Sequence, residues 1–472
     1  MSAPTPLSGD SAAPVQSLYE ARKNIHVRSV SGRFSTWRWA LVWITQAVFY
    51  GLCWLPWNGR QAVLFELAER KFYIFGLIFW PQDVFYLAVL LIIAAYSLFL
   101  FTAIGGRLFC GYACPQTVYT EIFMWIEEKI EGGRNSRMKL DAEPMSARKF
   151  GLKAAKHGIW IALGLWTGFT FVGYFTPIRT LANEVLSFNF GLGPWETFWI
   201  LFYGFTTYGN AGWMREQVCK YMCPYARFQS AMFDHDTLIV TYDAERGEPR
   251  GARSKKQDYQ AAGKGSCVDC GICVQVCPTG IDIRDGLQYE CIGCSACIDG
   301  CDQVMDKMSY PRGLIRYSTE HAMQAKWGNK EVFAHVLRPR TLIYGVILAL
   351  IIIAAGAALA LRMPLKVDVI RDRVEQARED ENLMIENHYR LQIMNVSEVP
   401  QHYLIDVSGM AGIFIESERS VVIPPLTTQS VSVEVHVPPA SGKKGYNRIY
   451  FAVKSLNDER IAVREKSNFL IP

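Results

Sequence analysis

Cys267-Val-Asp-Cys270-Gly-Ile-Cys273-Val-Gln-Val-Cys277 and Cys291-Ile-Gly-Cys294-Ser-Ala-Cys297-Ile-Asp-Gly-Cys301 are two copies of one cysteine pattern. Three thiolates at two-residue gaps surround one iron–sulfur cube, and the fourth cysteine of each copy reaches the other cube. The spacing therefore predicts one 4Fe-4S cluster on Cys267, Cys270, Cys273 and Cys301, and a second on Cys277, Cys291, Cys294 and Cys297. Paired zinc sites are the alternative, but four-ligand zinc leaves the third CxxC step and the crossover cysteine unexplained. The pattern predicts electron transfer.

The composition points to a membrane protein. The chain has 472 residues, of which 50% are hydrophobic and 13 are Trp, and its formal net charge is only +5. This length predicts two or three domains, and so small a charge gives no reason to expect a nucleic-acid partner. All 13 cysteines lie between Cys53 and Cys301. Their metal-type clustering argues against a disulfide scaffold.

Five apolar stretches are long enough to cross a bilayer as helices. They cover residues 37–57, 84–104, 159–175, 195–214 and 341–361, and no signal peptide precedes them. Lys and Arg collect before the first stretch, between the second and third, and after the fourth. This bias predicts a multi-pass protein of the bacterial inner membrane, with the N-terminus and the cysteine-rich segment cytoplasmic and the C-terminal part periplasmic.

The chain is predicted to divide into five parts. These are a cytoplasmic tail at 1–35, a four-helix membrane domain at 36–233, a ferredoxin-like domain with linkers at 234–340, a fifth transmembrane helix at 341–362 and a periplasmic domain at 363–472. In the last part Val431, Val433, Val435 and Val437 alternate with polar residues, and similar short runs recur. About seven such strands predict an immunoglobulin-like β-sandwich. The expected fold class is a membrane α-helical protein with five transmembrane helices, a bacterial-type 2[4Fe-4S] ferredoxin-like α+β insert and this sandwich.

A second motif occurs twice, after the second and the fourth apolar stretch. The two copies are Cys110-Gly-Tyr-Ala-Cys114-Pro115 and Cys219-Lys-Tyr-Met-Cys223-Pro224. A helical turn would bring both sulfurs of a copy to one face, and a helix starting at the proline would lower the thiol pKa of Cys114 and Cys223. If the two hairpins pack together, four thiolates converge at the cytoplasmic face and suit a soft metal such as Cu(I), or a cluster. Simple packing of buried cysteines is the alternative.

Further phrases carry a family resemblance from about residue 28 onward. They are Trp57-Asn-Gly-Arg-Gln-Ala, Arg70-Lys-Phe-Tyr-Ile-Phe-Gly and Phe79-Trp-Pro-Gln-Asp, together with both cysteine motifs. In these the chain resembles the cytochrome oxidase accessory proteins of the CcoG (FixG, RdxA) type. The resemblance implies a membrane-bound cupric reductase that supplies Cu(I) during assembly of cbb3-type oxidases. Asp302 departs from the usual ferredoxin pattern, in which a proline often follows the last cysteine.

We therefore expect an iron–sulfur oxidoreductase that reduces Cu(II) to Cu(I). The two clusters would carry single electrons to Cys110, Cys114, Cys219 and Cys223 as copper or redox thiols. The expected partners are the lipid bilayer, copper ions, an electron donor, and cbb3-type oxidase assembly factors or a copper chaperone. Two alternatives stay open: a quinol-linked membrane electron-transfer subunit, and a non-enzymatic assembly scaffold with structural clusters.

Overall fold

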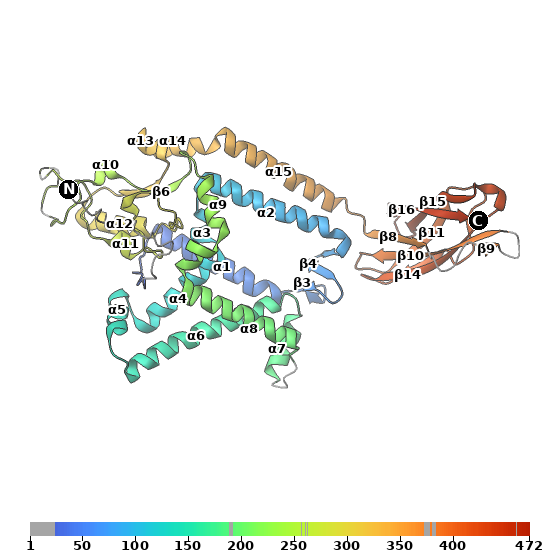
Figure 1. Cartoon of the computed structure of the whole chain (residues 1–472), viewed down its shortest axis with the longest axis horizontal. Helices are drawn as coiled ribbons and strands as arrows, with labels where there is room; N and C mark the ends of the chain where they lie inside the picture. The colour runs from blue at the N-terminus through green and yellow to red at the C-terminus, as the bar shows by residue number, and fades with distance from the viewer. Residues whose placement is uncertain are drawn as a thin grey trace, which may run out of the picture. The chain divides into compact units, whose positions relative to one another are not determined.

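The computed structural model describes residues 24–187, 192–255, 257–259, 261, 263–371, 378–379, 384–458 and 460–472. The chain forms two compact units, Met1–Ile351 and Ile352–Pro472 (Figure 1). The predicted N-terminal tail therefore lies outside the described residues as far as residue 23.

The first unit contains a set of long helices joined by short elements. The long helices are α1 (Arg33–Gly51), α2 (Val84–Gly105), α4 (Pro115–Glu131), α6 (Ala147–Val172), α8 (Pro194–Tyr208) and the first part of α15 (Pro339–Ala360), which continues beyond Ile351. Short helices α3 (Leu108–Tyr112), α5 (Arg134–Ala142), α7 (Ile178–Leu186) and α9 (Pro224–Met232) connect them. Between α1 and α2 the chain forms a small antiparallel sheet of β3 (Val63–Glu66), β4 (Lys71–Ile74) and β5 (Leu77–Phe79).

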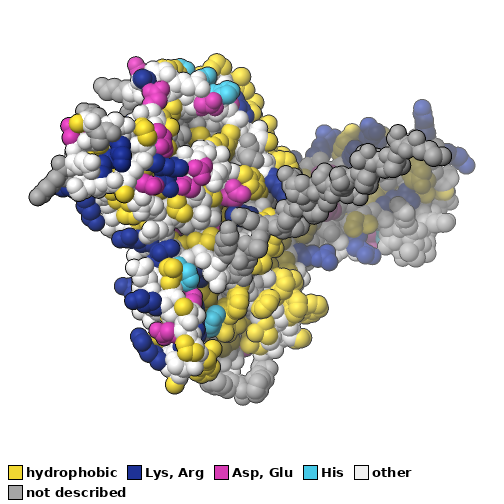
Figure 2. Space-filling model, turned by 60° about the vertical axis from the view of Figure 1, so that its left-hand side comes forward, with side chains coloured by type: hydrophobic (Ala, Val, Ile, Leu, Met, Phe, Trp, Pro, Cys, Tyr) yellow, Lys and Arg dark blue, Asp and Glu magenta, His cyan; other side chains and the backbone are white. Residues whose placement is uncertain are grey.

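Among the described residues, two helices are long and apolar enough to cross a membrane, Pro81–Gly105 and Pro339–Ala360. The other three predicted spans are helical but shorter or more polar than expected. The first stops at Gly51, because Pro56 and the short strand Pro56–Trp57 follow within the predicted 37–57. The fourth has only 15 residues of α-helix before it turns into the π-helix η3 (Gly209–Met214). Hydrophobic side chains nevertheless gather over one side of this unit (Figure 2).

Helices α6 and α8 pack closely because both carry glycine at their contact. A Cβ added at Gly168 would lie 2.2 Å from the carbonyl oxygen of Ile200, and one at Gly164 would lie 2.7 Å from the carbonyl oxygen of Gly204. Small residues four apart let two helix backbones approach in this way, a device common in membrane helix pairs. The contact joins the third and fourth predicted spans into one hairpin.

The ferredoxin-like insert follows α9. It contains the antiparallel pair β6 (Ile239–Tyr242) and β7 (Ile315–Ser318), with α11 (Ile272–Gln275) and α12 (Ala296–Met308) between them. Strand β6 lies within the predicted 234–340 segment, but the sequence alone did not indicate it. The strand was missed because it is only four residues long and finds its partner more than 70 positions later.

The second unit is a β-sandwich, as predicted. One sheet has the order β12-β14-β10-β8, with β9 paired to β10, and the other has the order β13-β11-β15-β16. Inward-facing side chains of both sheets form one buried core that includes Leu391, Ile405, Val435 and Phe451. The strands are β8 (Leu365–Arg371), β9 (Arg378–Glu379), β10 (Ile385–Asn395), β11 (Gln401–Ser408), β12 (Phe414–Ile415), β13 (Ser420–Ile423), β14 (Thr428–Val437), β15 (Gly445–Ser455) and β16 (Ala462–Ile471).

Candidate metal and electron-transfer site

The eight cysteines of the doubled motif line two neighbouring cavities. Cys267, Cys270, Cys273 and Cys301 line the first, which packs under β6 and α12. Cys277, Cys291, Cys294 and Cys297 line the second, and Cys273 touches it from the first. These are the two ligand sets that the crossover spacing predicts, each with its distant fourth cysteine. The donor chemistry of both cavities fits a 4Fe-4S cluster, which four cysteine thiolates hold.

Burial favours the protonated form of the thiols in these cavities. It raises the thiol pKa of Cys291 to about 12 and that of Cys301 to about 12. The pKa of Cys297 is raised by burial and by the neighbouring Cys294, Cys291 and Cys277. Thiols so perturbed hold their protons at neutral pH unless iron replaces them, so metal loading and proton release are coupled here.

The two CxxxCP motifs end in the same way, although the first lies on the α-helix α3 and the second on a π-helix. Cys114 and Cys223 are the capping residues before α4 and α9, and a proline occupies the first turn of each helix. In both motifs the backbone N–H of the second cysteine donates to the carbonyl five positions earlier: Cys114 to Phe109 at 3.0 Å, and Cys223 to Val218 at 2.8 Å. The second motif forms the π-helix η4 (Val218–Met222). This shared wide turn supports the view that the hairpins are a duplicated unit.

All four CxxxCP thiols lie in one electrostatic neighbourhood. Each of Cys114, Cys219 and Cys223 acts on the thiol pKa of Cys110, which burial raises to about 12. Burial raises the pKa of Cys219 to about 11 and also raises that of Cys114. The expectation that the helix N-terminus would lower the pKa of Cys114 is therefore wrong, because desolvation outweighs the helix dipole. Cys110 Sγ also donates a hydrogen bond to Gln229 Oε1 at 3.2 Å.

Two of the four CxxxCP thiols pack against residues that line the second cysteine cavity. Cys110 and Cys219 contact the buried group formed by Val276, Ile292, Cys294 and Ala296. Gly111 allows the two backbones to approach this closely. A Cβ at that position would lie 2.8 Å from the carbonyl carbon of Gly293 and 2.9 Å from Cα of Cys294. The middle of the first CxxxC turn thus touches the backbone of the second cluster motif.

Arg107, just before the first CxxxC turn, bonds to the second cluster motif and to α9. Its Nη1 donates to the carbonyl oxygens of Tyr289 and Cys291, and its Nη2 donates to the carbonyl oxygen of Ala226 on α9. Tyr289 in turn donates from its hydroxyl to the carbonyl oxygen of Lys220 at 3.0 Å, inside the second CxxxC turn. Sequence reasoning missed Arg107, Gly111 and Gln229, because only the folded chain brings them to the insert.

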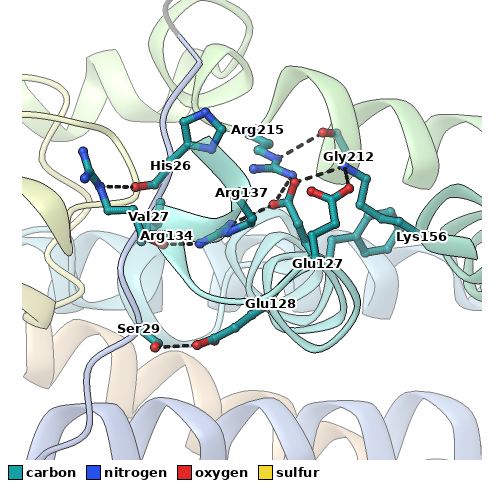
Figure 3. Close-up of polar contacts among 12 residues, drawn as sticks. His26, Val27, Ser29, Glu127, Glu128, Arg134, Arg137, Lys156, Gly212 and Arg215 are labelled. Carbon is teal, nitrogen blue, oxygen red and sulfur yellow. Dashed lines mark hydrogen bonds and ion pairs between the residues drawn. The ribbon is translucent and has the colours of Figure 1, made fainter. Parts of the chain in front are cut away.

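The described N-terminal residues 24–32 form an extended strap across the insert and the helices. The backbone N–H of Arg28 donates to the carbonyl oxygen of Gln275 at 2.8 Å, two residues before Cys277. On the other side Arg134 Nε donates to the carbonyl oxygen of His26 at 2.9 Å, and Ser29 donates to Glu128 Oε1 at 2.6 Å (Figure 3). The strap therefore ties the cluster-bearing segment to α4 and α5.

Beneath the strap lies a buried ionic network centred on Glu127. Its carboxylate is 3.1 Å from Arg137, 3.2 Å from Lys156 and 3.0 Å from Arg215, three cations from three different segments (Figure 3). Burial would raise the pKa of Glu127, but these cations together lower it to about 2. The network fixes α4, α5, α6 and the turn before the second CxxxCP motif against one another.

Asp299, between Cys297 and Cys301 on α12, caps the N-terminus of α1. Its two carboxylate oxygens accept from the backbone N–H of Phe34 at 3.2 Å and of Ser35 at 2.7 Å, across 265 and 264 positions of sequence. These N–H groups belong to the first turn of α1, which has no capping side chain of its own.

Comparison with known proteins agrees with this architecture. Residues 214–320 match the family described as 4Fe-4S dicluster domain, and residues 355–472 match the family described as IG-like fold at C-terminal of FixG, putative oxidoreductase. The chain is 39% identical to nitrogen fixation protein FixG of Rhizobium meliloti, over 83% of this chain and 80% of that protein. It is 38% identical to protein RdxA of Cereibacter sphaeroides, over 93% of this chain and 92% of that protein. The chain belongs to the FixG/RdxA family.

One match within this FixG-type chain bears on the CxxxCP thiols. Residues 87–132 match a further family described as 4Fe-4S binding domain, and the cysteines in that stretch are Cys110 and Cys114. A more distant relative, ferredoxin-type protein NapH of Haemophilus influenzae, is 23% identical over 47% of this chain and 69% of that protein. The first CxxxCP motif therefore lies in a stretch that matches a 4Fe-4S binding family.

Proposed function

We propose that this FixG-type iron–sulfur protein reduces Cu(II) to Cu(I) and thereby supplies copper for assembly of a cbb3-type oxidase. One observation carries the proposal: the thiols of Cys110 and Cys219 pack on the cavity of the second predicted cluster. A cluster bound there would have two soft sulfur donors beside it, with Cys114 and Cys223 close to Cys110, and such donors prefer Cu(I) among the copper states.

The reaction balances as a single-electron transfer. The eight cysteines of the doubled motif would hold the clusters that supply one electron at a time, and the substrate Cu(II) would take up one electron to become Cu(I). The residues of the chain contribute the path and the product site. Cys110, Cys114, Cys219 and Cys223 would hold Cu(I). Burial raises the pKa of the Cys110, Cys114 and Cys219 thiols, so copper bound there would replace protons.

The proposal places the protein in the bacterial inner membrane with five spans. Two helices, Pro81–Gly105 and Pro339–Ala360, meet the length and apolarity of a span. We assign the other three spans to α1, α6 and the α8–η3 segment, with the ferredoxin-like insert cytoplasmic and the β-sandwich periplasmic. An assembly factor or copper chaperone would receive the Cu(I).

Anaerobic copper reduction tests the proposal. The purified protein is reduced with dithionite, desalted and mixed with Cu(II) and a Cu(I)-specific chelator, while cluster absorbance is followed. We expect cluster reoxidation and Cu(I) formation in equal electron amounts. If the clusters stay reduced and no Cu(I) appears, the copper proposal fails. That result would favour a quinol-linked role or a scaffold role.

Serine variants of the four CxxxCP cysteines show where copper is held. We expect loss of Cu(I) formation while the iron of the two clusters is retained. The matched control is Cys53→Ser, a buried cysteine outside both motifs. Loss of about four further iron atoms per chain would instead identify the quartet as the ligands of another cluster.

A further inference from the structure

Arg107 is a buried cation that has no carboxylate partner. Four Lys and Arg residues are buried in the part of the chain that the structure describes, and Arg107, with 5% of its surface exposed, is one of them. No ion pair joins it to an acidic residue of the described ranges. Each of the other three lies beside a carboxylate: Arg38 is 3.5 Å from Glu121, Arg137 is 3.1 Å from Glu127, and Lys156 is 3.2 Å from Glu127.

Neutral groups hold the Arg107 guanidinium in place. It donates to the backbone carbonyl oxygens of Tyr289, Cys291 and Ala226, and its Cζ lies 5.1 Å from the centroid of the Tyr289 ring. These groups orient a cation but leave its net charge uncompensated. A buried charge without a counter-ion is strongly unfavourable in a native protein. The position of Arg107 therefore indicates that an anion belongs nearby.

The second cluster motif lies where that anion is needed. Cys291, whose carbonyl oxygen accepts from Arg107 at 3.4 Å, is one of the four cysteines that line the second cavity. A Cβ added at Gly293 would lie 3.2 Å from the carbonyl oxygen of Arg107, so the two backbones run against each other here. Arg107 also acts to lower the thiol pKa of Cys291, against the larger effect of burial. An iron–sulfur cluster on the four thiolates would place negative charge beside the guanidinium.

The CxxxCP thiols are less suited to be that anion. Arg107 also acts on the thiol pKa of Cys110 and of Cys219, but burial raises these two values to about 12 and about 11. Both thiols therefore keep their protons at neutral pH and stay uncharged until a metal displaces the protons. In the copper-free protein the negative charge beside Arg107 would thus be that of the second cluster.

Among the described residues, the first cavity has no comparable charge. Arg284 lines it but lies 2.6 Å from Asp269 and 2.6 Å from Asp282, so its charge is compensated twice. Arg253 donates to the carbonyl oxygen of Cys267 at 3.3 Å, yet it is only half-buried, and water weakens the field of a charge that it reaches. An uncompensated buried cation therefore distinguishes the second cavity from the first.

We propose that Arg107 raises the reduction potential of the second cluster and so draws an electron to the side of the insert that packs on Cys110 and Cys219. One-electron reduction adds a negative charge within the second cavity, and a fixed positive charge beside it stabilises the more negative state. The reduced state is thereby favoured next to the thiols that would receive copper. This inference rests on the proposed function for the copper acceptor alone, since the effect on the potential needs only the clusters.

A redox titration of the copper-free, full-length protein tests this role of Arg107. Dithionite is the reductant, and electron paramagnetic resonance follows two one-electron steps, one for each cluster. Arg107→Gln keeps N–H donors for the carbonyl oxygens and removes the charge. We expect one step to move to lower potential and the other to stay. At a fixed potential the ratio of reduced to oxidised cluster should fall at least about tenfold, which is a shift of ~59 mV for one electron.

Two further substitutions at this position separate charge from shape. Arg107→Lys keeps the positive charge and should hold both steps near the parent potentials, whereas Arg107→Met, which is neutral and has no donors, should lower the same step as Arg107→Gln. The matched control is Arg312→Gln, which removes an arginine of the insert whose side chain is 68% exposed and should leave both steps unchanged. The titration reports only loaded clusters, so partial loss of iron in a variant leaves the shift measurable.

Equal potentials in the parent and in Arg107→Gln overturn the proposal. A fall in Arg107→Lys as large as in Arg107→Gln also overturns it, because the loss would then come from hydrogen bonding rather than from charge. Equal shifts of both steps would show a general disturbance of the insert and refute it too. The sample contains no copper, so the potentials are measured independently of copper reduction, and failure of one proposal is distinguishable from failure of the other.

Discussion

Gly111→Ala should loosen the contact between the first CxxxC turn and the second cluster motif. The new Cβ would lie 2.8 Å from the carbonyl carbon and oxygen of Gly293 and 2.9 Å from Cα of Cys294. Carbon atoms pack at about 3.5 Å or more, so the two backbones must separate by roughly 0.7 Å. Both neighbours are backbone atoms and cannot rotate away. Such overpacking costs about 1–3 kcal/mol.

Two measurements report that change. Thermal loss of cluster absorbance should move to lower temperature, and reoxidation of the reduced clusters by Cu(II) should slow. Iron and sulfide contents at low temperature should stay at the parent values, because none of the eight predicted cluster cysteines is altered. The combination separates a displaced contact from a damaged cluster.

Gly158→Ala is the matched control, because a Cβ at that position of α6 meets nothing within 4 Å. We expect it to be neutral or slightly stabilising, by up to about 1 kcal/mol, since alanine favours a helix over glycine. If Gly111→Ala and Gly158→Ala match in both measurements, the close contact between the CxxxC turn and the cluster motif does not hold in solution.

Three further predictions concern the supports of the site. Glu127→Gln should lower the free energy of unfolding by about 3 kcal/mol at neutral pH, because the folded chain lowers the pKa of Glu127 from 4.5 to about 2. In the parent protein this stabilisation is complete above pH ~4.5 and is lost as the pH falls toward 2. Thermal unfolding against pH checks it, with the exposed Glu143→Gln as control, and equal curves would refute it. Gly168→Ala should lower the melting temperature of the helical unit because its Cβ meets Ile200 O at 2.2 Å, whereas Gly151→Ala, with nothing within 4 Å, should not. Asp299→Ala should remove about 1 kcal/mol of capping, seen as roughly fivefold faster hydrogen exchange in the first turn of α1, while Asp306→Ala leaves that exchange unchanged.

Local spacing was enough to predict what depends on neighbours in sequence. The two cysteine sets of the doubled motif line separate cavities as their spacing suggested, and the alternation at Val431–Val437 became strand β14. The proline after each CxxxC turn did begin a helix. These features depend on residue periodicity and on residues that favour turns, and both can be recognised in a single sequence.

What the sequence could not display are contacts between distant segments. Arg107 and Gly111 look like ordinary residues beside a motif until the insert folds back onto them. The thiol pKa of Cys114 was expected to fall with the helix dipole, but the extent of burial, which decides the outcome, is set by packing. The same holds for Glu127, whose three cationic partners come from positions 137, 156 and 215.

The cap that Asp299 places on α1 couples the stability of this helix to the folding of the cysteine-rich insert. The first turn of α1 is made early in synthesis, but its two N–H groups wait for a carboxylate made about 265 residues later. That carboxylate sits between Cys297 and Cys301, on a helix whose position depends on iron ligation in a domain of this kind. A chain without its iron would therefore leave the first turn of α1 uncapped, and that turn would fray, so the N-terminal segment and the cysteine-rich insert are stabilised together.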